Sequence, residues 1–190
     1  GPRHMTLRAW RDRRWETVKA MFAAGPPASP AYLTFGGMKN GGSHLDGLAE
    51  ALDWLVAAPQ IGFTNAIFSS CDLESLWHVL QQVPHVGPFI AMQICRDLFL
   101  ADALGHLDED SFVYIGPGAL PALETLYGPA PYTEQLKCIR RLWRRQPAWL
   151  QPPLALADVE QALCEWRKYF NLRAGRGKKR YFTPHGSPDP

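Results

Sequence analysis

The sequence predicts an all-α fold. Segments throughout the chain carry apolar residues at spacings of three and four, the pattern of a helix with one buried face. Only residues 111–115 ("SFVYI") have the β-branched and aromatic character of a strand, and this stretch is short. With 190 residues the chain is long enough to bury a core. We therefore expect one helical domain, and its length also allows two lobes around a cleft.

Pro- and Gly-rich connectors such as "AAGPPASP" and "RRQPAWLQPPLAL" separate the expected helices. Asp158 or the turn before it begins the last helix, and Gly175 ends it. Residues 1–4 look like the remnant of a protease and cloning site, so the expected domain covers residues 5–182 and is followed by a frayed polar end, 183–190. The expected helices are 6–22, 44–57, 72–82, 88–104, 118–127, 132–145 and 156–171.

Composition excludes several classes of protein. No apolar run reaches the roughly 18 residues of a membrane span, and no secretory signal precedes "TLRAWRDRRW", so a soluble intracellular protein is expected. The cysteines show neither a CxxC pair nor the spacing of a zinc or iron-sulfur site, which favours reduced, mostly buried thiols and no required cofactor. They are Cys71, Cys95, Cys138 and Cys164.

Positive residues are clustered although the formal net charge is only +2. Clustered cations displace counterions from a phosphate backbone, and neighbouring aromatic side chains can stack on bases, so the clusters suit DNA. Ordinary solvated helix faces are the alternative for each cluster. The clusters are Arg8, Arg11, Arg13 and Arg14 at the start; Lys137, Arg140, Arg141, Arg144 and Arg145 in one expected helix; and Arg173, Arg176, Lys178, Lys179 and Arg180 near the end.

The stretch "LQQVPHVGPFIAMQI" predicts a helix-hairpin-helix turn. Gly87 suits a left-handed conformation that lets the backbone approach a DNA phosphate, and Pro88 suits the first turn of the next helix. The backbone of His85, Val86 and Gly87 would then contact phosphate, helped by the helix dipole. A metal ion, monovalent or divalent, bridging the hairpin and DNA is left open. An ordinary tight corner between two helices is the alternative.

Gln93, Arg96 and Asp97 form a polar stripe on the helix that follows, which is otherwise apolar almost all round and is expected to be buried apart from this stripe. Buried polar groups are costly unless they are paired. The stripe therefore either closes an internal network or lines a cleft.

The sequence "VYIGPGAL" departs from base-excision glycosylases, in which a catalytic aspartate follows such a hairpin at about this distance. Here Ile115 and Gly116 stand at that place, and hydrolysis of the glycosidic bond is disfavoured. A glycosylase with a displaced acid such as Asp110 remains an alternative. Gly116, Pro117 and Gly118 open a helix, where amide donors at the positive dipole end predict an anion site.

Three segments, "VPHVGPFIAMQICRDL", "FVYIGPGALPAL" and "VEQALCEWRKYF" followed by "GRGKKRYF", together resemble the glycosylase-fold proteins of bacteriophage thymine hypermodification. That group includes amino acid:DNA transferases, the α-putrescinylthymine and α-glutamylthymine pyrophosphorylase-like enzymes, and the helical domain of 5-hydroxymethyluracil DNA kinases. The resemblance covers residues 70 to 181. It implies a DNA-glycosylase-like helical fold in the cytoplasm of a phage-infected bacterium.

The resemblance also implies transfer chemistry on double-stranded DNA carrying a modified thymine. A kinase first makes the pyrophosphate ester of hydroxymethyluracil; the transferase then replaces pyrophosphate with an amine, either an amino acid such as glycine or a polyamine. The chain has no GxxxxGK[ST] loop, so it is not that kinase. The target base must leave the stack and enter a pocket. A non-catalytic DNA-binding module that partners a 5-hydroxymethyluracil DNA kinase is the alternative.

Under this resemblance the site residues take roles. Asp97 or Glu165 accepts the proton of the amine, and Gln93 reads the uracil edge. Glu165 and Lys168 have an alternative reading as an exposed ion pair. The pyrophosphate and substrate site is expected to comprise Arg96, Lys168, Gly116, Pro117, Gly118 and Tyr169, together with Lys39 in the Gly-rich stretch before residue 44. The residues expected to contact DNA are His85, Val86, Gly87, Lys178, Lys179 and Arg180.

Overall fold

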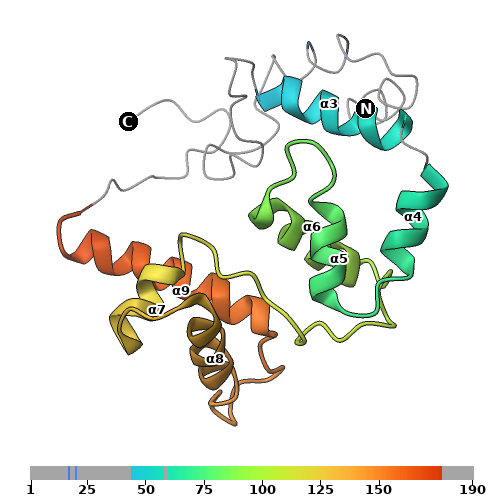
Figure 1. The fold of residues 1–190 in the computed structure, drawn as a ribbon. Coiled ribbons are helices and arrows are strands. Elements are labelled where there is room, and N and C mark those ends of the chain that lie inside the picture. The colour runs from blue at the N-terminus through green and yellow to red at the C-terminus, as the bar shows by residue number, and fades with distance from the viewer. Residues whose placement is uncertain (1–16, 18–19, 21–43, 58–59, 177–190) are drawn as a thin grey trace. The chain divides into compact units, whose positions relative to one another are not determined.

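The computed structural model describes residues 17, 20, 44–57 and 60–176, and in this part of the chain every regular element is an α-helix (Figure 1). The expected all-α fold is confirmed. Residues 112–116 form no regular element in the described structure, and the short strand-like stretch is therefore not a strand. Phe112, Val113 and Ile115 are buried there, so the strand-like composition of this segment reflects burial rather than sheet pairing.

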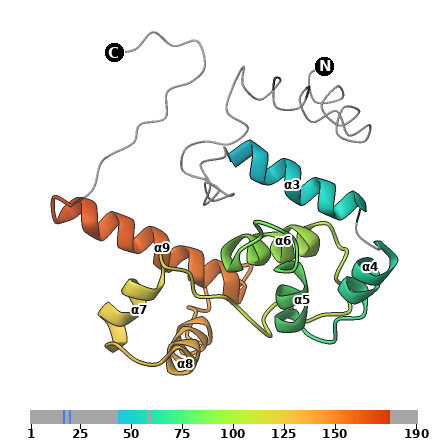
Figure 2. The same ribbon diagram turned by 45° about the horizontal axis from the view of Figure 1, so that its top comes forward.

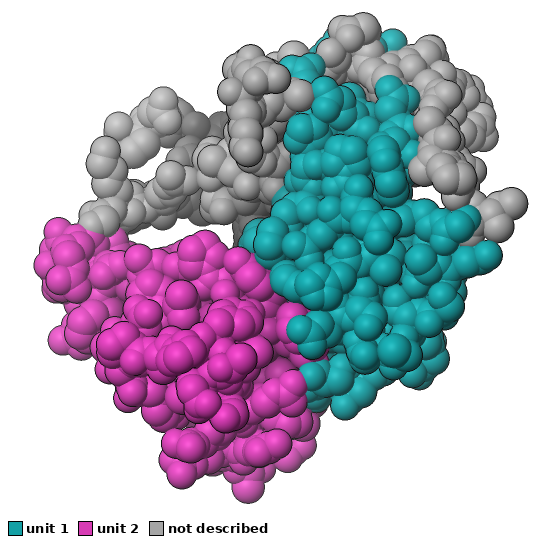
Figure 3. Space-filling view, viewed as in Figure 1, with its two compact units in different colours: residues 1–111 teal, residues 112–190 magenta. Residues whose placement is uncertain are grey.

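The chain divides into two compact units, residues 1–111 and 112–190 (Figure 3). The described helices of the first unit are α3 (His44–Ala57), α4 (Gln60–Phe68), α5 (Leu73–Leu80) and α6 (Pro88–Leu100). Those of the second are α7 (Leu120–Tyr127), α8 (Tyr132–Trp143) and α9 (Leu156–Arg173) (Figure 2).

In the first unit α5 packs against α6, and α3 meets α4. Asp72 caps the start of α5: its carboxylate accepts a hydrogen bond of 2.7 Å from the Ser75 N–H, which lowers the pKa of Asp72. Trp54 of α3 and Phe63 of α4 form an edge-to-face pair with ring centroids 5.0 Å apart. Helix α4 was not among the expected helices, since "QIGFTNAIF" contains residues of low helix propensity, including Gly62.

The second unit is a three-helix arrangement in which α7 and α8 both pack on α9 and on each other. Its core contains Leu123 of α7, Ile139 of α8, and Leu156 and Leu163 of α9, each buried at its helix face. Burying such a side chain stabilises the fold by about 1.5–3 kcal/mol. The turn at residues 116–118 leads into α7.

Two helix ends show what sequence pattern can and cannot predict. Helix α9 begins as expected, because the Asp158 carboxylate accepts a hydrogen bond from the Ala155 N–H, and Gly175 ends it with φ +71°. Helix α6 was expected to reach residue 104 but ends at Leu100. Asp102 adopts a left-handed conformation with φ +55°, a cap role that glycine or asparagine fills more often.

No helix in the described ranges is long and apolar enough to cross a bilayer. All four cysteines are free thiols: Cys95 is buried, Cys138 and Cys164 are half-buried, and Cys71 is exposed.

Candidate functional site

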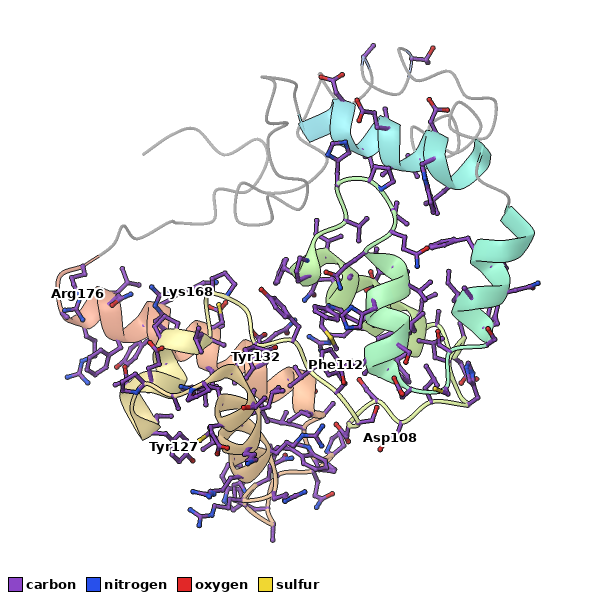
Figure 4. All side chains as sticks on the ribbon, viewed as in Figure 1. Asp108, Phe112, Tyr127, Tyr132, Lys168 and Arg176 are labelled. Atoms are coloured by element: carbon purple, nitrogen blue, oxygen red, sulfur yellow. The ribbon has the colours of Figure 1, made fainter. Side chains whose placement is uncertain are left out.

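The turn before α7 is held by the side chains of two other helices. Gly116 is buried, and its N–H donates a hydrogen bond of 3.0 Å to Oε1 of Glu160 in α9. The Ile115 N–H donates one of 3.0 Å to Oη of Tyr132, the first residue of α8 (Figure 4). Glu160 is only 8% exposed. A buried carboxylate therefore lies where the sequence led us to expect backbone donors open to a ligand.

This geometry changes what the turn offers to an anion. The amide of Gly116 already has an anionic acceptor from the same chain, and Pro117 has no N–H. A carboxylate is in fact present beside residues 115 and 116, although it comes from α9 and not from the turn itself. Sequence reasoning missed Glu160. The available signal was its place on the apolar face of α9 with Leu156, Val159 and Leu163.

Gly118 lies in close contact with α9. A Cβ at this position would stand 2.3 Å from Sγ of Cys164 and 3.4 Å from its Cβ. Real Cβ atoms do not approach other atoms so closely, so the contact between the turn and α9 requires glycine. Burial raises the pKa of the Cys164 thiol, which keeps this neighbour neutral.

Arg167 also touches the turn, and sequence reasoning did not single it out. Its Nη1 donates a hydrogen bond of 3.1 Å to the carbonyl of Pro117. Arg167 follows Glu160 by seven residues, two helical turns, so both side chains rise from one face of α9 towards residues 116 and 117. The turn is thus bound by a guanidinium group that was not among the predicted anion-binding groups.

Two of the predicted catalytic residues form an exposed ion pair on α9. Nζ of Lys168 lies 2.5 Å from Oε1 of Glu165, and both side chains are more than half exposed (Figure 4). Such pairs contribute about 0–1 kcal/mol to stability. Tyr169 beside them is exposed, and the guanidinium of Arg173 lies 5.9 Å from its ring centre. The pair is accessible to a ligand, as its predicted role requires.

The hairpin between α5 and α6 differs from the expectation at one residue. Gly87 was expected to be left-handed, but it is the extended N-cap of α6 with φ −81°, and His85 takes the left-handed conformation with φ +63°. Pro88 does occupy the first turn of α6. A Cβ on Gly87 would meet no atom within 4 Å, so glycine is not needed there for packing.

The His85 side chain explains why a non-glycine residue holds this strained position. Its Nε2 lies 2.7 Å from Oε2 of Glu50 in α3, and its ring packs over Gly47. On the other side of the turn, Nε1 of Trp77 donates a hydrogen bond of 2.8 Å to the carbonyl of Pro88. Val86 is buried. These contacts fix the turn, and they engage the imidazole of His85 within the protein.

The polar stripe of α6 has the spacing that was expected, but the helix around it is less buried than its composition indicated. Ile90, Ala91, Met92 and Cys95 form one buried face, whereas Phe89 is exposed and Leu100 is 84% exposed. Asp97 is exposed, and Gln93 and Arg96 are half-buried. The expectation of a rod buried almost all round was wrong, because α6 packs mainly through the face that meets α5.

The predicted site residues fall into both units. Gln93, Arg96 and Asp97 belong to the first, and the turn at 116–118 with Glu165, Lys168 and Tyr169 belongs to the second. Four further predicted contacts lie outside the described residues: Lys39, Lys178, Lys179 and Arg180.

A family model described as the helical domain of 5-hmdU DNA kinase matches residues 21–179, most of the chain. The chain belongs to this family. Comparisons with curated proteins and with solved structures gave no significant match. Membership of the 5-hmdU DNA kinase helical-domain family connects the chain to DNA modification and agrees with its all-helical structure. The matched range contains the hairpin, the turn at 116–118 and α9.

Proposed function

We propose that this protein is a DNA base hypermodification transferase, which displaces pyrophosphate from 5-pyrophosphoryloxymethyluracil in DNA with an amine. The observation that carries the proposal is its membership of the 5-hmdU DNA kinase helical-domain family, whose name refers to the hydroxymethylated base. Three segments that resemble thymine-hypermodification proteins add support.

The reaction forms one bond and breaks one. The amine nitrogen bonds to the exocyclic methylene carbon of the base, the bond from that carbon to oxygen breaks, and pyrophosphate leaves with the electron pair. The amine loses a proton, which a carboxylate accepts. The enzyme must therefore supply a base, cations for the leaving group and a pocket for an unstacked base.

The residues predicted from the sequence keep their roles in the proposal. Asp97 or Glu165 accepts the proton, and both carboxylates are exposed enough to meet a substrate. Gln93 reads the uracil edge, and Arg96 or Lys168 receives pyrophosphate. Because the Gly116 amide already donates to Glu160, side-chain cations take more of this task than the turn does.

The test is a transfer assay. DNA bearing pyrophosphorylated hydroxymethyluracil is incubated with the protein and glycine or putrescine, then digested, and the nucleosides are identified by mass spectrometry. We expect an amine adduct and released pyrophosphate. Glu165→Gln is compared with Glu134→Gln, since Glu134 forms a matching exposed pair with Lys137 at 2.7 Å on α8. Asp97→Asn is compared with Asp102→Asn, another exposed acid of the same unit.

If Glu165 or Asp97 is the base, its variant loses at least tenfold in rate while the matched control stays within twofold. Base release without an adduct would indicate a glycosylase using a displaced acid. Absence of any product with every amine would contradict the transferase.

A second function is favoured by one observation: the matched family is a domain of a kinase. A non-catalytic helical module would bind DNA and present it to a 5-hydroxymethyluracil DNA kinase. It predicts that adding this protein raises the rate of that kinase on DNA, and that Asp97→Asn and Glu165→Gln leave the increase unchanged. A loss of the increase in either variant would count against a purely architectural role.

A further inference from the structure

A stripe of cations runs along one side of α8. Lys137, Arg140, Arg141, Arg144 and Arg145 line a cavity of about 490 Å³ that contains no acidic residue in its lining. Lys137, Arg140 and Arg141 share one face of α8, and Arg144 and Arg145 follow at its C-terminal end, while Gln135 and Ile139 are buried. Figure 4 shows nitrogen-tipped side chains gathered around this helix.

The charge of the stripe exceeds what the helix itself requires. The helix dipole stabilises cations in the last turn, but the negative end of the dipole is equivalent to only about half a unit charge. Within α8, Nζ of Lys137 lies 2.7 Å from Oε1 of Glu134. Arg141, Arg144 and Arg145 are exposed and line a cavity whose lining residues are all basic, and this arrangement favours an anionic partner.

The length of the stripe suits a run of phosphates. From residue 137 to its end at Trp143, α8 rises about 9 Å at 1.5 Å per residue, and Arg144 and Arg145 extend the stripe just beyond that end. One strand of DNA carries a phosphate about every 3.4 Å along the axis, so the stripe faces roughly three or four phosphates. Arginine forks also match phosphate oxygens in pairs.

The loop that follows α8 is held in one conformation by its own hydrogen bonds. Gln146 donates to the carbonyl of Leu154 at 2.9 Å and accepts from its N–H at 2.7 Å, and Nε1 of Trp143 donates to the same carbonyl at 2.9 Å. Leu150 N–H donates to the Pro147 carbonyl at 3.0 Å inside the loop. The two ends of the loop are thus fastened together beside the cation stripe.

This loop carries Trp149, whose side chain is 80% exposed. Trp149 follows Arg145 by four residues, so its Cα lies within about 14 Å of that of Arg145. An exposed indole on a hydrogen-bonded loop near a row of cations is a combination that can bind the backbone of a nucleic acid and stack on an unpaired base. Preorganisation lowers the entropy cost of such a contact.

We propose that the α8 stripe and Trp149 form a DNA-binding surface, in which the arginines bind the phosphates of one strand and Trp149 stacks on an unstacked base. The choice of DNA over other polyanions rests on the proposed function. The residues of this surface are different from those of the α5–α6 hairpin and of the turn at 116–118, and all of them belong to the second unit.

The test measures binding of the full chain to unmodified duplex DNA and to the same duplex with one unpaired base, by fluorescence anisotropy at several salt concentrations. Substituting Arg141, Arg144 and Arg145 together with glutamine should reduce the slope of log K against log salt by about 3. The matching triple lysine variant keeps the charge and should keep the slope. Circular dichroism and thermal unfolding of each variant show that it is folded.

Trp149→Ala should weaken binding to the DNA with an unpaired base by about tenfold to a hundredfold, and affect the perfect duplex less. Tyr127→Ala removes another exposed aromatic side chain of the second unit and should change neither. An unchanged salt slope in the glutamine variant overturns the stripe. Equal losses on both DNAs for Trp149→Ala overturn the stacking role.

Poly-glutamate serves as a competitor. If it displaces DNA as well as unlabelled DNA does, the surface binds any polyanion and the proposal fails. The binding assay needs neither an amine nor a modified base, so its result stands even if the transfer reaction fails. Conversely, a negative binding result does not decide the transfer assay, which is judged by its products.

Discussion

The Glu160 carboxylate of α9 accepts a hydrogen bond of 3.0 Å from the buried N–H of Gly116, forty-four residues earlier in the chain. This bond joins the entry to α7 to the second turn of the last helix. It also places an acid beside the residues at which a glycosylase would carry its aspartate.

Removing the Glu160 carboxylate should destabilise the second unit. Glu160→Ala leaves the Gly116 amide buried without its acceptor, which costs about 1–3 kcal/mol. Glu160→Gln keeps an oxygen that can accept the bond and should lose less. Urea unfolding of the two variants measures the difference. An alanine variant as stable as the glutamine variant would show that this bond contributes nothing.

Gly118→Ala should destabilise the protein by about 1–3 kcal/mol, because its Cβ collides with Sγ of Cys164. In a Cys164→Ala background the nearest contact becomes the Cβ of residue 164, at 3.4 Å, and most of the loss should disappear. A double-mutant cycle measured by urea unfolding gives the coupling. Equal losses in both backgrounds would mean that Cys164 is not the obstacle. Substitutions at Gly118 therefore report on packing before they report on chemistry.

The stability of the protein should fall with rising pH in part because of Cys95. Burial raises the pKa of this thiol from the ordinary value of 9.0 to about 12. Between these values the unfolded chain has lost the proton and the folded chain keeps it, so the contribution is complete below pH 9 and is lost as the pH rises towards 12.

Cys95→Ala removes this dependence. The free energy of unfolding should decline less steeply in the variant above pH 9, by on the order of 1 kcal/mol per pH unit, while the two profiles run parallel below pH 8. Urea unfolding at pH 7, 8, 9.5 and 10.5 measures both slopes. Profiles that stay parallel throughout would rule out a buried, neutral thiol.

Gly87→Ala tests the hairpin as a DNA contact. With φ −81° and open space around the missing Cβ, alanine should leave the thermal unfolding temperature within about 2 °C. If a phosphate approaches this backbone, the added methyl group should weaken DNA binding severalfold. Unchanged binding would favour an ordinary helix corner. Asp102→Asn, at an exposed residue outside the turn, is the control.

Local sequence was sufficient for most helices and for several of their ends. Apolar spacing predicted α3 and α5 to α9, and Pro88, Asp158 and Gly175 predicted ends because each acts through its own backbone or a neighbour within a few residues. It failed for α4, where the Trp54–Phe63 contact compensates for weak propensity. It also failed at the hairpin, where Glu50 and Gly47 hold His85 in the conformation that glycine would adopt most easily.

By itself the sequence determined the all-α class, the helix order and the cation spacing of α8, since these depend on periodicity and composition. Only the tertiary structure decided which distant groups meet at the turn. Glu160 accepts the hydrogen bond of the Gly116 amide, and Arg167 donates to the Pro117 carbonyl. Gly118 lies so close to Cys164 that a side chain would not fit. Those pairs are more than forty residues apart, and the packing of α7 on α9 brings them together. Contacts at such separations depend on how whole helices pack, which no local pattern encodes.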